Sequence, residues 1–182
     1  QDPIIHFYET FLAEYDPKLR KSRGVWYTPE PVVNFIVRAV DDILKTDFNL
    51  PQGLADTSKT TVEIDSPVLV GRGRNKATRM AKMKKEVHKV QILDPATGTG
   101  TFLAETIKYI YQNNFTGMGG AWSHYVEQDL IPRINGFEIL MASYAMAHLK
   151  IELLLNETGY KPNKQQRLNV YLTNSLEEPH AD

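Results

Sequence analysis

Residues 90–114 read VQILDPATGTGTFLAETIKYIYQNN: a short apolar run, a turn rich in glycine and threonine, and a stretch with helical periodicity. The helix should bury the face formed by Leu103, Ile107, Ile110 and Tyr111, which recur at spacings of one, three and four residues. A buried strand, a glycine turn and a helix in this order begin a βαβ unit.

The following chain continues the alternation of strands and helices. Residues 134–139 predict a second buried strand, residues 140–159 a buried helix that stops at Gly159, and residues 167–176 a third short strand with its exit loop. Before them, residues 117–120 predict a loop and residues 122–131 a short helix. The order predicts an α/β fold with a doubly wound parallel sheet.

The glycine turn indicates what kind of ligand the sheet would bind. Gly98 and Gly100 would let a ligand approach the main chain. Leu103 stands where the dinucleotide pattern has its third glycine, and no Gly-Lys-Ser/Thr follows, so both phosphate-binding patterns are disfavoured. Asp94 at the strand end would repel phosphate and favours an ammonium group, such as that of S-adenosylmethionine.

Glu138 ends the second predicted strand, where a carboxylate can accept hydrogen bonds from ribose hydroxyls. The alternative is a solvated strand end. The strand-like run before Glu138 and the buried helix after it favour ligand binding.

Two helices are predicted before this core. Residues 3–15 carry an apolar stripe, and a second helix should begin with Thr28 as its N-cap and Pro29 in its first turn. The buried face of the second helix should consist of Val33, Ile36, Val37, Val40 and Leu44. We therefore divide the chain into an N-terminal helical segment, 1–55, and a partial cofactor-binding core, 56–182.

A basic insertion near residues 70–86 interrupts this core. Residues 60–70 and 84–93 are strand-like and residues 71–79 turn-like, so we expect a hairpin or a long loop. Eight of the 21 lysines and arginines lie between Arg72 and Lys89, with Glu86 as the only acid. A run of charged residues most often forms a solvated loop. The alternative interpretation is that these residues contact DNA phosphates.

The bulk composition limits the classes of protein. With 182 residues, a net charge of -1 and no cysteine, the chain fits one globular domain in a reducing compartment, and we expect it in the cytoplasm. No apolar run could span a bilayer and no signal peptide is visible, so no membrane partner is expected. The five histidines lack metal-ligand spacing, which predicts no metal site. A start at Gln1 and an end without a tapering tail suggest a piece of a longer protein.

DPATGTGTF (94–102) resembles motif I of the amino-methyltransferases that act on DNA, particularly the gamma group, which methylates adenine N6. GVWYTP (24–29) is similar to motif X of that group, and Glu138 matches the acid of motif II. Asn174, Ser175 and Leu176 fall where motif III is expected, although the family usually has Asp where this chain has Asn174. Nearly the whole chain, residues 2–33 above all, is similar to the methyltransferase region of single-polypeptide type I restriction-modification enzymes.

This resemblance implies a truncated, Rossmann-like methyltransferase core that binds S-adenosylmethionine, with a helical N-terminal lead-in. Glu138 would hold the ribose, Ile139 would pack on the adenine ring, and Asn174 would bond its edge. The residues that the resemblance places around the cofactor are Tyr27, Thr28, Pro29, Asp94, Pro95, Ala96, Thr97, Gly98, Gly100, Thr101, Phe102, Glu138, Ile139, Asn174, Ser175 and Leu176.

The resemblance also implies what lies outside these residues. The family transfers the methyl group with an Asn/Asp-Pro-Pro-Tyr/Phe motif, and none occurs in residues 1–182, so no catalytic residue is expected here. Double-stranded DNA, a helicase-like domain and a target-recognition domain would be partners in the full-length protein. Backbone contacts with DNA would come from Arg72, Arg74, Lys76, Arg79, Lys82, Lys84 and Lys85.

Two other functions remain open at this point. A methyltransferase acting on RNA or on a protein amide would share motif I, although the aromatic-Thr-Pro element before it favours DNA. A non-catalytic nucleotide-binding α/β module is disfavoured by Asp94 and Glu138.

Overall fold

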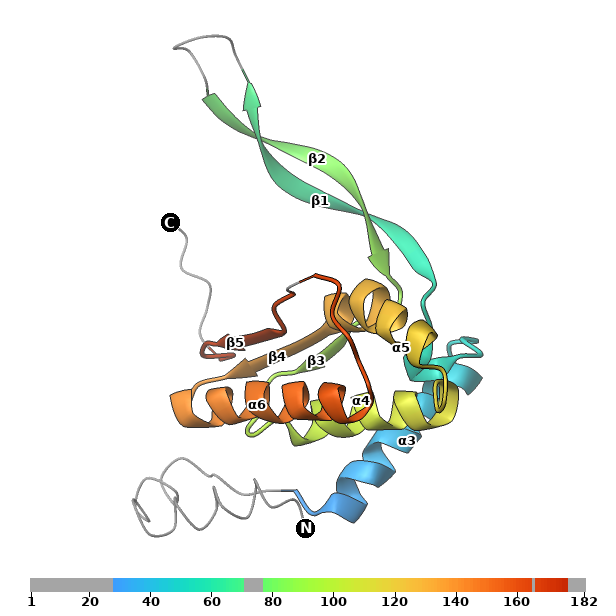
Figure 1. Cartoon of the computed structure of the whole chain (residues 1–182). Helices are drawn as coiled ribbons and strands as arrows, with labels where there is room; N and C mark the ends of the chain where they lie inside the picture. The colour runs from blue at the N-terminus through green and yellow to red at the C-terminus, as the bar shows by residue number, and fades with distance from the viewer. Residues whose placement is uncertain (1–27, 71–76, 165, 177–182) are drawn as a thin grey trace.

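A computed structural model describes residues 28–70, 77–164 and 166–176 of the chain. Its centre is a parallel sheet of three strands in the order β3 (Ile92–Asp94), β4 (Ile134–Glu138) and β5 (Asn169–Leu172) (Figure 1). The register pairs Asp94 with Gly136 and Glu138 with Leu172, so all three carboxyl ends meet at one edge. The predicted α/β class is confirmed.

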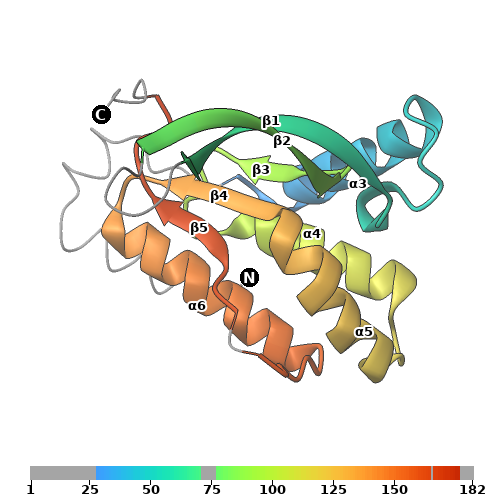
Figure 2. The same ribbon diagram turned by 90° about the horizontal axis from the view of Figure 1, so that it is seen from above.

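Two crossover helices cover one face of this sheet. The helix α4 (Thr101–Asn114) joins β3 to β4, and α6 (Met141–Glu157) joins β4 to β5. Because α4 and α6 contact each other, both lie on the same side of the sheet (Figure 2). The predicted double winding is therefore not seen in the described residues, whose strands are added in one direction only.

The core lies between these helices and the sheet. As predicted, α4 buries Leu103, Ile107 and Ile110, whereas Tyr111 only packs against the core from its side. From α6 and the sheet come Ala147, Ile151 and Leu155, with Ile134 and Val170. Gly159 follows the end of α6 with φ +79°, the left-handed backbone that favours glycine at a helix C-terminus, as predicted.

A continuous helical run leads from α4 into β4. It consists of α5 (Gly119–Tyr125), the π-helix η2 (Val126–Leu130) and the short 3₁₀ helix η3 (Ile131–Arg133). The predicted loop over 117–120 is wrong for its last two residues, which begin α5, and the predicted helix starts three residues earlier than expected. Trp122 and Tyr125 are buried in the core and explain why the run is helical.

The first described helix, α3 (Glu30–Thr46), differs from its prediction in two respects. Its N-cap is Pro29, with no side-chain capping bond, so the prediction of Thr28 as N-cap is wrong. Val33 and Val37 are buried as predicted, but Ile36 and Val40 are exposed. The helix thus has two apolar faces, one in the core and one at the surface. None of the described helices combines the length and apolarity needed to cross a membrane.

A buried carboxylate connects α3 with the rest of the fold. Asp41 Oδ1 accepts a hydrogen bond from Leu54 N at 2.8 Å, and Oδ2 accepts one from the Tyr109 hydroxyl at 2.9 Å. Lys45 Nζ lies 2.6 Å from Asp41 Oδ2. Leu54 belongs to the 3₁₀ helix η1 (Gly53–Ala55). Burial, together with the bond to Asp41, raises the pKa of Tyr109 to about 12.

The predicted hairpin is confirmed and is longer than expected. The strand β1 (Lys59–Val70) pairs antiparallel with β2 (Ala77–His88), and the two project away from the body (Figure 1). The prediction of one strand over 84–93 is wrong: residues 84–88 end β2, and Ile92 begins β3 of the other sheet. Residues 77–79, predicted as turn, belong to β2.

We predict that Asp41→Ala lowers the free energy of unfolding by about 2–4 kcal/mol, because three donors lose a buried, charged acceptor. Urea denaturation followed by circular dichroism measures this. Asp42→Ala, which removes the neighbouring exposed carboxylate, is the control and should change stability by less than about 0.5 kcal/mol. Equal effects of the two variants would show that the Asp41 network does not stabilise the fold.

Candidate functional site

The turn between β3 and α4 is fixed by bonds to its own strand and to β4. Thr97 N donates to Phe137 O at 2.9 Å, and Thr97 Oγ1 donates to Asp94 O at 3.0 Å. Ala96 N donates to Asp94 Oδ1 at 3.1 Å, and Gly100 N to Thr97 O at 2.8 Å. The backbone of residues 96–100 therefore has one defined path over the ends of the strands.

The two glycines of the turn have different roles. Gly98 has φ +55°, and a Cβ atom added there would meet nothing within 4 Å. Gly100 has φ +80°, and its Cβ would lie 3.2 Å from Ala147 Cα. Gly98 thus leaves open space beside the main chain, where a ligand could approach, whereas the space at Gly100 is taken by the packing of α4 against α6.

Gly136 of β4 is a site-building residue that the sequence interpretation did not identify. A Cβ atom there would lie 2.5 Å from Thr97 Oγ1 and 3.0 Å from Leu103 Cδ1. Only glycine lets β4 come this close to the turn. The available signal was a glycine inside a strand pattern, which often marks close approach of another segment.

Glu138 joins the glycine turn to the start of α6. Its Oε2 accepts a hydrogen bond from Gly98 N at 2.7 Å, and its Oε1 accepts one from Leu140 N at 2.7 Å. The residue is buried. A carboxylate offers about four acceptor positions, so these two bonds leave capacity for hydroxyl donors of a ligand.

Asp94 lies in the same negative region. Burial raises the pKa of its carboxyl, the hydrogen bond from Ala96 N opposes this, and the negative charge of Glu138 adds to the rise. Asp94 Oδ2 is buried and has no hydrogen-bond partner among the described residues. The hydroxyl of Thr99 is likewise buried without a described partner. An unpartnered carboxylate oxygen beside a second acid fits a ligand that brings a positively charged donor.

The third strand ends beside Glu138. Thr173 N donates to Glu138 O at 2.8 Å, and Asn174 Oδ1 accepts a bond from Leu176 N at 3.1 Å, which shapes the exit turn. Ile139 is 52% exposed and offers an apolar surface, while Leu176 is 92% exposed and touches little. Ser175 lies in the same exposed turn.

The remaining residues predicted to contact the cofactor either lie at the starts of α3 and α4 or fall outside the residues that the structure describes. Tyr27 is outside the described residues, and Thr28 and Pro29 lead into α3. Burial raises the pKa of Glu105, Lys108 opposes the rise, and the charge of Glu30 adds to it, so the start of α3 lies near α4. Thr101 Oγ1, at the start of α4, lies 3.3 Å from Lys150 Nζ.

A groove of about 450 Å³ runs along the outer edge of β3. Its walls are mainly apolar and come from the exposed face of α3, from residues 89–95 and from the first turns of α4, including Phe102. Asp94 and Pro95 form its boundary with the glycine turn. The groove is next to the polar site but differs from it in chemistry.

Comparisons with known proteins show which proteins this chain resembles. The family model described as N-6 DNA Methylase matches residues 1–51. A cryo-EM structure of a DrdV–DNA complex is 25% identical, with a TM-score of 0.63 over 95% of this chain and 12% of that one. A search among curated proteins found no match.

Two further solved structures share the fold at 24% identity. A nuclease-deletion mutant of the Type ISP restriction-modification enzyme LlaGI, in complex with a DNA substrate mimic, has a TM-score of 0.57 over 92% of this chain and 11% of its own. The ATP-dependent Type ISP restriction-modification enzyme LlaBIII, bound to DNA, has a TM-score of 0.61 over 93% and 9%. The chain thus spans about a tenth of these proteins, and the resemblance found in the sequence is confirmed.

We predict that Asp94→Asn stabilises the chain at neutral pH. Because burial raises the pKa of Asp94 in the folded state, the stability that its neutral form contributes is complete below pH 3.8 and is lost as the pH rises through the raised value. Asparagine keeps the acceptor for Ala96 N and stays neutral. The melting temperature of the variant should exceed that of the parent by about 2 °C at pH 7 and match it at pH 3. A variant that melts lower at pH 7 would contradict this account.

Proposed function

We propose that this chain is the S-adenosylmethionine-binding part of a site-specific DNA methyltransferase that methylates adenine N6 in a restriction-modification system. The observation that carries the proposal is the pair Asp94 and Glu138 on either side of the open backbone at Gly98. This pair lies at the carboxyl ends of parallel strands, where sheets of this class bind ligands.

The finer fold assignment belongs to the same proposal. Three parallel strands joined by crossover helices, with the candidate site at their carboxyl ends, support a Rossmann-like methyltransferase core. The outer edge of β3 is unpaired in the described part of the chain and is flanked by the apolar groove. Further strands of a complete core would pair there. We keep the division into a helical segment, 1–55, and a core, 56–182, as part of this proposal.

The resemblance implies a role for each residue of the site, and the chemistry of each residue is compatible with that role. The unpartnered Oδ2 of Asp94 would accept hydrogen bonds from the ammonium group of the cofactor, beside the backbone of Ala96, Thr97 and Gly98. Glu138 would accept hydrogen bonds from the ribose hydroxyls, and the exposed Ile139 would pack on the adenine ring. Asn174 would contact the edge of that ring.

The bound cofactor would supply an electrophilic methyl group on a sulfonium centre. These residues would position the ligand. Glu138 bonds to both the glycine turn and the start of α6, so the groups that the cofactor would contact already have a fixed geometry. The groups that receive a target adenine flipped out of the duplex would come from the Asn/Asp-Pro-Pro-Tyr/Phe motif, which residues 1–182 lack.

We propose double-stranded DNA as the substrate of the complete enzyme, with helicase-like and target-recognition domains as its other parts. The structures to which the chain is similar contain DNA, which supports this. Among the basic residues, Arg72, Arg74 and Lys76 lie outside the described residues. Lys82 and Lys84 lie opposite Asp65 and Glu63 in the hairpin, which reduces their value for phosphate contact.

We predict that the chain binds S-adenosylmethionine in titration calorimetry and that Glu138→Gln weakens binding by about tenfold or more, because a charged acceptor becomes neutral. Glu152→Gln, an exposed acid on α6, is the matched control and should bind like the parent. Circular dichroism checks that Glu138→Gln, which keeps one acceptor oxygen, stays folded.

If the chain does not bind, the titration is repeated on a chain that continues about a hundred residues beyond Asp182, roughly the size of a missing domain half. Binding there would mean that further strands complete the pocket. A longer chain that also fails to bind would refute the proposal.

We predict, separately, that residues 1–182 alone transfer no methyl group to DNA. The expected result is no tritium above background in duplex DNA incubated with the chain and tritiated S-adenosylmethionine, while a chain that includes the catalytic motif is labelled. Labelling by the 182-residue chain would mean that the transfer residues lie within it.

A further inference from the structure

The hairpin β1–β2 reaches far beyond the body of the chain. At about 3.4 Å per residue, twelve paired residues extend about 40 Å. Figure 1 shows that the outer part has no other described element against it. A two-stranded sheet without such cover is marginally stable in water.

The register divides the hairpin into two unlike faces. Residues opposite each other in an antiparallel pair lie on the same face. One, which we name the charged face, carries Lys59, Glu63, Asp65, Lys82, Lys84 and Glu86, with Pro67 and Met80 near its outer end. The other, which we name the apolar face after its commonest residues, carries Val62, Ile64, Val68, Ala81, Met83 and Val87, together with the small polar residues Thr60 and Ser66.

The charged face is nearly neutral. Its three lysines are matched by three acids, because Glu63 lies opposite Lys84 and Asp65 opposite Lys82. Lys59 Nζ lies 3.9 Å from Glu86 Oε2. A surface that already balances its own cations gains little from neutralising DNA phosphates.

The apolar face exposes hydrophobic side chains and carries unbalanced positive charge. Ile64 is 39% and Met83 49% exposed, and they lie opposite each other in its middle. Lys85, opposite Val62, and Arg79, opposite Val68, are exposed and are the charged residues of this face in the described hairpin. An apolar strip with a cation on either side is typical of a protein interface.

We propose that the apolar face docks on another protein surface of the enzyme, one that is apolar and edged by carboxylates that meet Arg79 and Lys85. The proposal rests on the function proposed above, because it requires the chain to be part of a larger protein. DNA would satisfy the two cations but would leave Ile64 and Met83 without apolar contact. A second copy of this face would bring Arg79 and Lys85 toward cations of the same sign.

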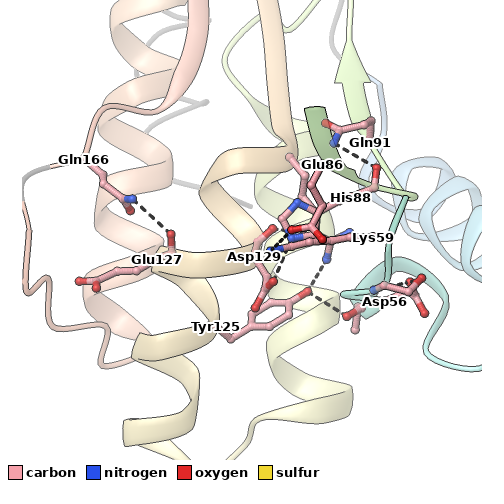
Figure 3. A network of polar contacts seen from close by, with 12 residues as sticks. Asp56, Lys59, Glu86, His88, Gln91, Tyr125, Glu127, Asp129 and Gln166 are labelled. Carbon is pink, nitrogen blue, oxygen red and sulfur yellow. Dashed lines mark hydrogen bonds and ion pairs between the residues drawn. The ribbon is translucent and has the colours of Figure 1, made fainter. Parts of the chain in front are cut away.

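Polar contacts at the base of the hairpin, where it joins the body, fix the direction in which it projects (Figure 3). His88 Nε2 lies 2.9 Å from Asp129 Oδ1, and both side chains are largely buried. Asp129 O accepts a bond from Arg133 Nε at 2.9 Å, and the buried Arg133 also donates to the Tyr125 hydroxyl. That hydroxyl donates to Ala55 O at 3.3 Å, just before β1. A fixed base lowers the entropy lost when the apolar face docks.

Hydrogen exchange of the amides in β1 and β2, measured on the complete enzyme without DNA, tests the proposal. We expect the hairpin to be protected, and Ile64→Ser with Met83→Ser to increase its exchange rate by about tenfold or more. Glu63→Gln with Lys84→Gln alters an opposite pair on the charged face and should leave the rate unchanged. Arg79→Glu with Lys85→Glu retains the apolar residues and should also release the hairpin.

Four results would overturn the docking. These are a hairpin without protection, protection that appears only when duplex DNA is added, protection that depends on enzyme concentration, and equal exchange in the apolar-face and charged-face variants. S-adenosylmethionine binding by the same preparations is measured in parallel. Retained binding with an unprotected hairpin rejects the docking alone, whereas absent binding rejects the proposed function.

Discussion

The close approach of β4 to the glycine turn is the constraint on which the rest of the site depends. Gly136 has no side chain, so Thr97 can lie against β4 and donate its amide to Phe137 O. This contact brings Gly98 N within 2.7 Å of Glu138 Oε2. Without it, the turn after β3 and the acid that ends β4 would be two separate strand ends. With it, they form one surface whose parts cannot move independently.

That surface holds an acid in an unfavourable environment. Burial and the neighbouring Glu138 both act against an ionised Asp94, and its Oδ2 lacks a described partner. If the proposed function holds, the chain loses some stability by keeping this acid at its binding site, as functional sites commonly do. The same reasoning explains why the open space lies at Gly98 and not at Gly100, where packing of the helices takes it.

Local patterns predicted the part of the fold that is determined locally. The strand, turn and helix over 92–114, the strand at 134–138 and the glycine stop at Gly159 follow from periodicity and from glycine chemistry. The errors came from tertiary contacts. The apolar period of α3 cannot say which of its two apolar faces meets α4, and β-like residues 84–93 cannot show where one sheet ends and the next begins. The role of Gly136 depends on Thr97, 39 residues earlier in the sequence. A glycine inside a strand pattern signals a close approach, but it does not show which segment approaches.

The two uncovered apolar surfaces, the groove beside β3 and the apolar face of the hairpin, differ in the kind of contact that would cover them. The groove between α3 and β3 borders an unpaired strand edge, and strand edges in soluble proteins are normally paired or covered. The apolar face of the hairpin lies farther out. A buried polar network that includes Asp129 and Arg133 holds the base of the hairpin against the body. We propose that the edge of β3 beside the groove pairs with further strands, whereas the projecting hairpin docks on a separate surface. Under the two proposals, the chain would make two kinds of contact with the rest of a larger enzyme, one that completes the core and one that orients it.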